Sequence, residues 1–280
     1  MKTRLSLVLG ALLLGGSSYA QEGTVKIGAA LLPQSTWLLN QDDSDAGPNL
    51  DYQTTWGFAG GLTVAYHFTD YLGVGLDVLY SSQGQKYKGT ESGTNLSAQT
   101  TLNYLKLPLL FRFNSDPNSP VQFSFFAGPQ ANLLLSYTDK AEVTGGGITW
   151  TFETQNQEKT TTFSGPGTTF TDKTSLTAKA YKPLTLGAVV GLGAGFKLTE
   201  ELLLGVHVRL DYIFGDVENK DCKVNHPLAG VGATHQDPYW EVKPRYNFSS
   251  TGAPAGYTRP STQALTGGLM LSLTYALPMR

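Results

Sequence analysis

From residue 23 onward, apolar and polar residues alternate with a period of two in eight segments. Successive side chains of a β-strand point to opposite faces, so this period predicts strands with one apolar face. In the clearest segment, Leu202 to Phe214, apolar side chains alternate with Gly205, His207, Arg209 and Asp211. The eight predicted strands lie within residues 25–31, 56–68, 72–80, 105–113, 121–137, 184–198, 202–214 and 265–277.

The connections between these segments alternate between short and long along the chain. The short ones are predicted at residues 69–70, 114–119 and 199–200, and the long ones at residues 39–53, 88–98, 138–178 and 218–262. A meander with every short turn at one rim and every long loop at the other is typical of outer-membrane barrels. We therefore predict an all-β fold, an eight-stranded antiparallel up-and-down transmembrane β-barrel with long extracellular loops.

The alternative is a soluble eight-stranded barrel of the lipocalin kind, which also alternates and is also secreted. Such a calyx lines its ligand pocket with its apolar face, whereas the second face here is rich in Gly, Ala, Thr and charge. Aromatic residues also end the apolar face at both rims, as in the interfacial girdles of membrane barrels. They are Tyr66, Phe68, Tyr71, Phe111, Phe113 and Phe196 near the short turns, and Tyr80, Tyr137, Tyr212 and Phe214 near the long loops.

The first twenty residues have the three parts of a secretory signal peptide. Lys2 and Arg4 form a positive region, residues 5–14 are apolar, and Ser18-Tyr19-Ala20 fits a cleavage site. We expect a signal peptide over residues 1–20, cleavage after Ala20, and a single barrel domain over residues 21–280 in the bacterial outer membrane.

Composition excludes several classes of protein. Charged residues make up only 15% of the chain, against roughly 25% in soluble domains. No apolar run of about 20 residues, the length of a helical membrane span, occurs in the body of the chain. A net charge of −2 without a basic run argues against a nucleic-acid partner. The single cysteine, Cys222, excludes an internal disulfide.

Four short segments resemble a known family. They are Asn103-Tyr104-Leu105-Lys106-Leu107-Pro108-Leu109-Leu110 and Phe126-Ala127-Gly128-Pro129, together with Lys26-Ile27-Gly28 and Gly73-Val74-Gly75-Leu76. They are similar to the PorT-type outer-membrane β-barrel family of Bacteroidota. The resemblance implies a surface-exposed barrel in a family whose members mostly lack an assigned activity. Some relatives serve in protein secretion and gliding, and no residue carries that role over to this chain.

The polar face of the strands predicts a charged lumen. By parity, the charge network in the lumen comprises Lys26, Asp77, Lys106, Arg112, Lys197, His207, Arg209 and Asp211, with His67, Gln130 and Asn132 on the same face. An eight-stranded barrel is just wide enough for its side chains, and buried charges must be paired, so we expect salt bridges that plug the lumen. The alternative is a narrow ion path in which Asp77 or Asp211 exchanges basic partners.

A second alternative is catalysis. His207, Arg209 and Asp211 share one face. A His with an Asp resembles part of a hydrolytic triad, and some small outer-membrane barrels are lipid-modifying enzymes. The two residues lie four positions apart on one strand, and no Ser in a Gly-x-Ser-x-Gly context accompanies them. We therefore predict no catalytic residues and no enzymatic activity.

The long loops are the expected place for function because the barrel itself does not need them. Exposed aromatic residues are typical of protein or glycan contacts, although they can equally pack on one another to order the loop. The predicted contact residues are Tyr239, Trp240, Tyr246, Phe248 and Tyr257. In residues 138–178, Ile148 to Phe152 alternates and could extend a hairpin beyond the membrane.

No cofactor or metal is predicted. Asp42-Asp43-Ser44-Asp45 could bind Ca²⁺ but does not match a calcium loop, so we expect an exposed acidic tip. His226, His235 and Cys222 lack zinc-type spacing, and Cys222 is expected to be a solitary loop thiol.

The sequence therefore predicts a non-enzymatic, monomeric barrel that contacts outer-membrane lipid and presents long loops for a protein or glycan partner or a structural role. The alternatives are a small porin-like ion or solute channel through the charged lumen and, less favoured, a lipid-modifying enzyme.

Overall fold

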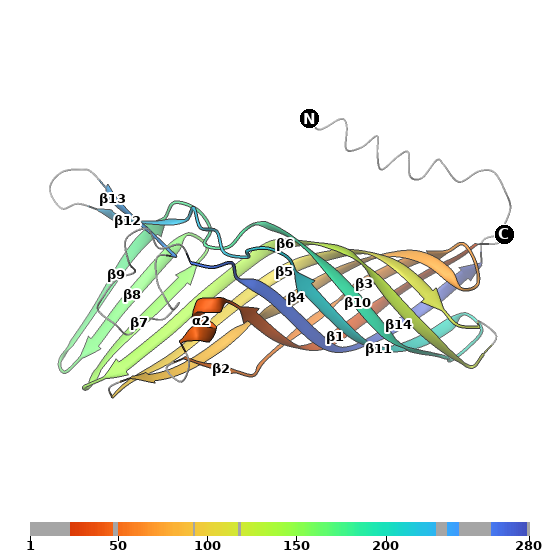
Figure 1. The fold of residues 1–280 in the computed structure, drawn as a ribbon, viewed down its shortest axis with the longest axis horizontal. Coiled ribbons are helices and arrows are strands. Elements are labelled where there is room, and N and C mark those ends of the chain that lie inside the picture. The colour runs from red at the N-terminus through yellow and green to blue at the C-terminus, as the bar shows by residue number, and fades with distance from the viewer. Residues whose placement is uncertain are drawn as a thin grey trace.

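The computed structural model describes residues 23–46, 50–91, 93–116, 119–227, 234–240 and 259–278. The predicted signal peptide lies outside these residues. Eight strands form the barrel wall (Figure 1). They are β1 (Thr24–Leu39), β3 (Thr55–His67), β4 (Leu72–Glu91), β5 (Thr94–Asn114), β6 (Val121–Gly145), β10 (Leu184–Lys197), β11 (Leu202–Ile213) and β14 (Gln263–Pro278).

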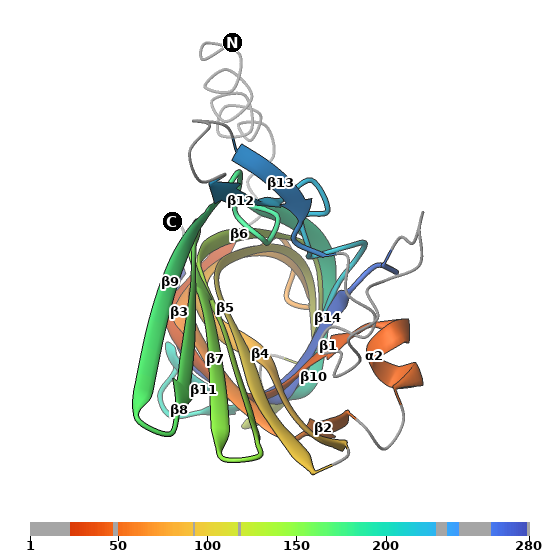
Figure 2. The same ribbon diagram turned by 90° about the vertical axis from the view of Figure 1, so that its left-hand side faces the viewer.

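Neighbouring strands pair antiparallel until the sheet closes into a ring. The order β1-β3-β4-β5-β6-β10-β11-β14 returns to β1, because β6 pairs with β10 and β14 pairs with β1. Figure 2 shows this ring nearly end-on, as a closed wall around the lumen. Hydrocarbon offers no hydrogen-bond partner, so only a closed sheet satisfies every backbone group of a β-structure in a membrane. The predicted eight-stranded up-and-down barrel is confirmed.

The outward face of the ring is apolar along its length. Leu31, Leu62, Leu186, Leu192 and Phe123 are each more than 60% exposed, which would be costly in water and is favourable in lipid. Among the described residues, no helix is long and apolar enough to cross a membrane.

The aromatic residues predicted for the two girdles are exposed on this outward face, with one exception. Tyr137 is 1% exposed and points inward. The reason is a β-bulge, since Asn103 pairs with Ser136 but Tyr104 pairs with Leu134, which leaves one extra residue in β6. Beyond the bulge the inward parity of β6 is reversed, so the prediction for Tyr137 was wrong.

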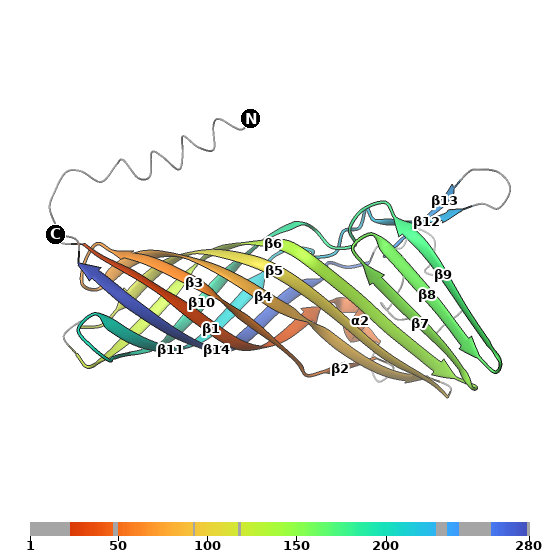
Figure 3. The ribbon, with the colours of Figure 1, turned by 180° about the vertical axis from the view of Figure 1, so that it is seen from behind.

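The strands on one side of the barrel run far beyond the ring. β6 pairs with β10 only as far as Leu133, and from Thr138 it pairs with β7 (Ile148–Gln155). β8 (Glu158–Gly165) and β9 (Thr168–Leu176) continue this extension (Figure 3). The hairpin strand expected at Ile148 to Phe152 is confirmed.

The connection expected as a long loop at residues 88–98 is instead a tight hairpin, because β4 ends at Glu91 and β5 begins at Thr94. The apolar period ends near Tyr80, and polar inward residues such as Ser81, Gln83 and Gln85 carry the strand onward. From Ser81 to Gln85 neither face carries an apolar side chain, and beyond them Tyr87, Leu96 and Ala98 are apolar on the inward face instead. The outward apolar period therefore stops near Tyr80, which is why the sequence analysis predicts no strand there.

The remaining elements lie at the end of the barrel opposite the short turns. They are α2 (Gln41–Asp45), β2 (Asp51–Gln53), β12 (Lys223–Pro227) and β13 (Thr234–Pro238). Here loop residues and inward-facing strand residues form one apolar cluster at the long-loop end of the lumen, which we call the cap. The cap includes Leu38, Leu102, Tyr104, Leu134, Tyr137, Leu176, Ala180, Tyr181, Ile213, Val217, Cys222, Val224, Trp240 and Ala264.

The lipid-facing assignment predicts a depth-dependent cost of charge. Leu192 and Leu198 are both exposed, but Leu192 lies well inside β10 and Leu198 lies at the short turn. We expect Leu192→Arg to lower the free energy of unfolding in phospholipid vesicles by about 2–4 kcal/mol, and Leu198→Arg by about 0–1 kcal/mol. Urea unfolding followed by tryptophan fluorescence measures both. Equal losses at the two positions would contradict a bilayer around this wall.

Candidate functional site

Five predicted lumen residues form one continuous chain of ion pairs. Lys106 Nζ lies 2.7 Å from Asp211 Oδ2, and Arg209 Nε lies 2.8 Å from Asp211 Oδ1. Arg209 Nη1 also lies 3.3 Å from Asp77 Oδ2, and Arg112 Nη2 lies 2.9 Å from Asp77 Oδ1. We call Arg112, Asp77, Arg209, Asp211 and Lys106 the lumen ion-pair chain.

This chain crosses the barrel from wall to wall. Asp77 is on β4 and Arg209 is on β11, and these strands stand four steps apart in a ring of eight, which is diametrically opposite. Arg209 and Lys106 are at most 1% exposed, and Arg209 Nη2 also donates to Gln130 Oε1 at 3.1 Å. Buried charges are tolerated only when paired and hydrogen-bonded, a condition that this geometry meets.

An apolar cluster lies beside the lumen ion-pair chain, with Phe126 against Arg112 and Met270 against Arg209. It consists of Ala30, Leu32, Ala59, Leu110, Phe126, Val189 and Met270. The Phe126 ring fits against the neighbouring strand because Gly191 has no side chain, since a Cβ there would lie 2.2 Å from the ring. The charged and apolar side chains together fill the middle of the lumen.

Lys26, Lys197 and His207, the other charged or titratable members of the predicted network, form no ion pair with the chain among the described residues. Lys197 is on the exposed rim at the end of β10, and Lys26 lies near the same rim on β1. His207 Nε2 lies 2.6 Å from Ser124 Oγ, and no hydrogen-bond partner is found for its Nδ1 among the described residues. Asp211 contacts Lys106 and Arg209, so the structure does not assemble a His207–Asp211 pair.

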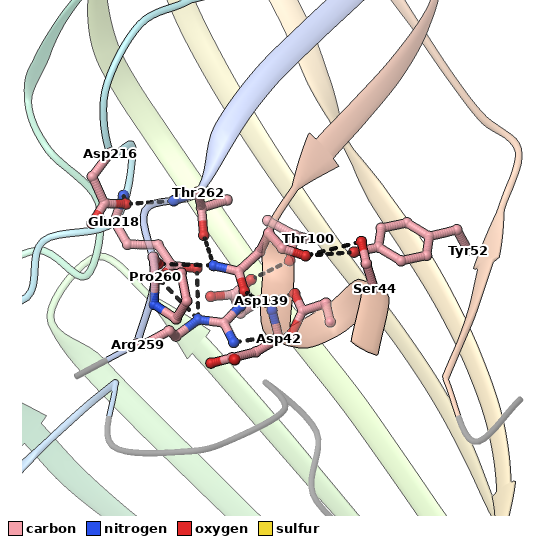
Figure 4. Close-up of polar contacts among 12 residues, drawn as sticks. Asp42, Ser44, Tyr52, Thr100, Asp139, Asp216, Glu218, Arg259, Pro260 and Thr262 are labelled. Carbon is pink, nitrogen blue, oxygen red and sulfur yellow. Dashed lines mark hydrogen bonds and ion pairs between the residues drawn. The ribbon is translucent and has the colours of Figure 1, made fainter. Parts of the chain in front are cut away.

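A second buried ion-pair cluster joins the loops at the long-loop end of the barrel, and Figure 4 labels two of its members, Arg259 and Glu218. Arg259 Nη1 and Nη2 donate to the two carboxylate oxygens of Asp43 at 3.0 and 2.8 Å, and its Nε donates to Glu218 at 3.1 Å. We call Asp43, Glu218 and Arg259 the loop clasp. All three are at most 4% exposed.

The loop clasp overturns one prediction. Asp42 and Asp43 were expected at an exposed acidic tip, but both are buried on α2, with Asn40 as the N-cap. Asn40 Oδ1 accepts from the Asp42 backbone, while Asn40 Nδ2 donates to Pro260 O and Thr262 Oγ1. Asp43 is buried because its carboxylate pairs with Arg259, 216 residues away, whereas Ser44 and Asp45 at the end of the run are exposed as expected.

A carboxylate that the sequence analysis missed anchors the cap. Asp139 accepts from Thr100 Oγ1 at 2.7 Å and from the Tyr181 hydroxyl at 2.9 Å. Its inward position follows from the bulge in β6, so parity counted from the membrane part of the strand does not find it. Tyr137 accepts from the Ala180 backbone N–H at 3.1 Å and holds the loop over the lumen.

Of the predicted contact residues, Trp240 belongs to this cap and Tyr239 packs against it. Trp240 is 5% exposed, donates from Nε1 to Ala180 O at 3.1 Å, and packs edge-on against Tyr181. Tyr239 packs on Trp240 with ring centroids 4.8 Å apart. Trp240 is thus buried in the loop rather than displayed, whereas Tyr246, Phe248 and Tyr257 lie outside the described residues.

Cys222 is buried in the cap and donates to Ala178 O at 3.3 Å. Burial raises the pKa of its thiol to about 11. His226 and His235 face each other in the β12–β13 hairpin, and each lies near Asp237. Within the described ranges, no group of three His, Cys, Asp or Glu side chains is arranged to hold a metal ion.

The sheet beyond the barrel has one aromatic face. Trp150, Phe163 and Phe170 occupy directly paired positions on β7, β8 and β9, and Phe152 stacks beside Trp150. We call these four residues the aromatic row. Trp150 is 40% and Phe170 60% exposed. The residues between them in sequence, on the opposite face, are mostly threonine, including Thr149, Thr151, Thr162, Thr169 and Thr171.

Comparison with known proteins identifies the domain. The profile of the family described as outer membrane protein beta-barrel domain matches residues 20–218 of the chain. No curated protein matches the sequence.

Several solved structures resemble the chain at low identity. Neisserial surface protein A is 14% identical with a TM-score of 0.37, covering 92% of this chain and 99% of its own. A major outer membrane protein from Thermus thermophilus is 16% identical with a TM-score of 0.41, covering 91% and 99%. The outer membrane protease OmpT from Escherichia coli is 10% identical with a TM-score of 0.41, covering 93% and 99%.

Breaking the lumen ion-pair chain is expected to destabilise the barrel strongly. Asp211→Asn removes the carboxylate that pairs with Lys106 and one of the two carboxylates that pair with Arg209. Removal of one partner from a buried ion pair lowers the free energy of unfolding by about 3–5 kcal/mol. The control is Glu153→Gln, which breaks an exposed pair with Lys140 and is expected to cost less than about 1 kcal/mol. Urea unfolding in vesicles measures both, and equal effects would contradict a structural role for the chain.

The cap is expected to protect Cys222 from alkylation. At pH 8, the raised pKa leaves about one hundredth of the thiolate of an ordinary cysteine, and reactivity increases as the pH approaches 11. Arg259→Gln removes the cation of the loop clasp and should speed labelling by iodoacetamide, whereas Lys173→Gln on the exposed sheet should not. Mass spectrometry follows this single thiol. Fast labelling of the unmodified protein would show that the cap does not close as described.

Proposed function

Since the chain belongs to the outer membrane protein beta-barrel domain family, we propose that it is a non-enzymatic barrel with a closed lumen that acts through the sheet and loops at its long-loop end. It resides in the bacterial outer membrane. The observation that carries the proposal is the lumen ion-pair chain, which spans the barrel between opposite strands. A partner protein or glycan would bind outside the membrane.

Two further features support a closed lumen. The cap places apolar side chains across the lumen at its long-loop end. The loop clasp joins α2, the segment after β11 and the segment before β14. A conducting pore needs a continuous polar path, and these layers interrupt it with apolar groups and paired charges.

The aromatic row supports a binding role for the projecting sheet. Aromatic side chains are enriched at contact sites, and Trp150 and Phe170 remain exposed beyond the point where β6 leaves the ring. The Thr-rich opposite face and the nearby Lys159, whose Nζ lies 5.9 Å from the Phe152 ring centroid, give the sheet a polar surrounding. Assignment to the PorT-type branch of Bacteroidota belongs to this proposal and rests on the motifs at residues 103–110 and 126–129.

One further residue of a hydrolytic triad lies beside His207, but among the described residues the carboxylate that a triad needs does not. Ser124 supplies a hydroxyl beside His207, which the sequence analysis did not find. A hydrolytic triad also needs a carboxylate on the far nitrogen of the His, and among the described residues none accepts from His207 Nδ1. We therefore keep the non-enzymatic proposal. Phospholipid turnover that disappears in His207→Ala would refute it.

Single-channel recording tests the closed lumen. The purified barrel, refolded and checked by heat-dependent gel mobility, is expected to show no conductance steps in a planar bilayer. Asp211→Asn is recorded alongside, because loss of the Asp211 carboxylate breaks two ion pairs of the lumen ion-pair chain. A reproducible conductance in the unmodified protein, altered in Asp211→Asn, would instead establish the channel function.

Site-specific photo-cross-linking tests the aromatic row. A benzophenone amino acid at position 170, which is exposed on β9, is expected to form a discrete adduct with a non-lipid partner on whole cells. The same probe at position 196, exposed on the barrel wall, should label only lipid. A probe at position 170 that reacts with nothing but lipid would rule out this face as the binding surface.

A further inference from the structure

The lumen holds a second polar feature, at the short-turn end, that the proposed function does not use. A recess with a cavity volume of about 40 Å³ lies among the ends of β1, β3, β5, β6, β10, β11 and β14. Its lining includes Lys26, His67, Arg112 and His207, and the neutral donors Asn114 and Ser124. Among the described residues that line it, none is Asp or Glu.

The charges of the lumen do not balance at this end. The lumen ion-pair chain contains three cations and two carboxylates, and both carboxylates are already shared. Lys26 adds another cation, with no carboxylate within ion-pair distance in the described part of the chain. Toward the rim, Lys26 also lines a small pocket with Lys197, Glu200 and Glu201 on the turn between β10 and β11. An excess of positive charge therefore remains inside the wall, where dielectric screening is weak.

Several hydrogen-bonding groups around the recess are arranged in pairs. Asn114 Nδ2 lies 2.7 Å from His67 Nε2, and Ser124 Oγ lies 2.6 Å from His207 Nε2. Arg112 Nη2 donates to Thr63 Oγ1 and to Asp77 Oδ1, while the buried Arg112 Nε has no hydrogen-bond partner among the described residues. Asp77 occupies one edge of Arg112, but the described lining of the recess itself has cations and hydrogen-bond donors and no carboxylate, which is the chemistry that binds an oxyanion.

We propose that this recess binds a small oxyanion of the phosphate class, held chiefly by Lys26 and Arg112. The cavity volume corresponds to about three water-sized groups, so it suits a phosphate group and excludes a nucleotide. The source of the group is either free inorganic phosphate or a phospholipid headgroup, since the short-turn rim lies at the membrane surface. The site is independent of the aromatic row and of partner binding.

Calorimetric titration of the folded barrel in nonionic detergent with inorganic phosphate, at constant ionic strength in chloride, tests the proposal. Saturable binding is expected, and Lys26→Gln should weaken it by at least about tenfold, because charge-assisted hydrogen bonds are the strong ones. Lys26→Arg should retain it. Lys140→Gln, an exposed position at the long-loop end, is the matched control and should leave it unchanged.

A second titration with dihexanoyl-phosphatidylglycerol separates the two sources. Binding of the lipid but not of inorganic phosphate, with the same dependence on Lys26, supports the site and identifies a headgroup as its ligand. If neither binds, or if Lys26→Gln binds as well as the unmodified protein, the proposal is overturned. Heat-dependent gel mobility of each variant confirms that the protein tested is folded.

Discussion

Inside a membrane, a backbone N–H or C=O that leaves its partner finds no water to replace it, and this constraint governs the whole molecule. The sheet meets it by closing, with β6 paired to β10 and β14 paired to β1. Closure in turn fixes the radius of an eight-stranded ring, and that radius leaves room for side chains but not for an open pore. The apolar outer face and the filled interior are both consequences of the same closed hydrogen-bond ladder.

The charged side chains inside such a ring must then be paired with opposite charges. Charged side chains buried there are removed from solvent, so each needs a partner of opposite charge. Arg209 meets this need by contacting Asp77 on the opposite wall and Asp211 on its own strand. The lumen ion-pair chain thus connects the walls and fills the space between them. The cationic excess that remains gathers at the short-turn mouth, where Lys26 and Arg112 line the same recess.

Where the strands leave the membrane, water can hydrogen-bond to the backbone, and the sheet no longer needs to be a closed ring. β6 loses its pairing with β10 after Leu133, has an extra residue at the bulge, and continues between β5 and β7 in a sheet whose strands β7, β8 and β9 carry the aromatic row. The bulge turns Tyr137 and Asp139 inward, where they hold the loop around Tyr181 over the lumen. One inserted residue therefore links the barrel wall, the cap and the projecting sheet.

The pattern of apolar and polar residues was enough to predict the number of strands in the ring, their order, the positions of the short turns and which side chains of the membrane part face inward. A strand that contacts lipid on one face must alternate, and that period is visible in residues such as Leu202 to Phe214. The contacts of Asp77 with Arg209, of Asp43 with Arg259 and of Ser124 with His207 emerged only from the folded chain. These pairs join residues 132, 216 and 83 positions apart, and their contacts depend on ring closure and loop packing, which leave no period in the chain. Two further features were visible only in the structure. The strand ends beyond Tyr80 lie outside the membrane and do not need an apolar outer face, and the bulge that turns Tyr137 inward leaves no mark in the apolar period.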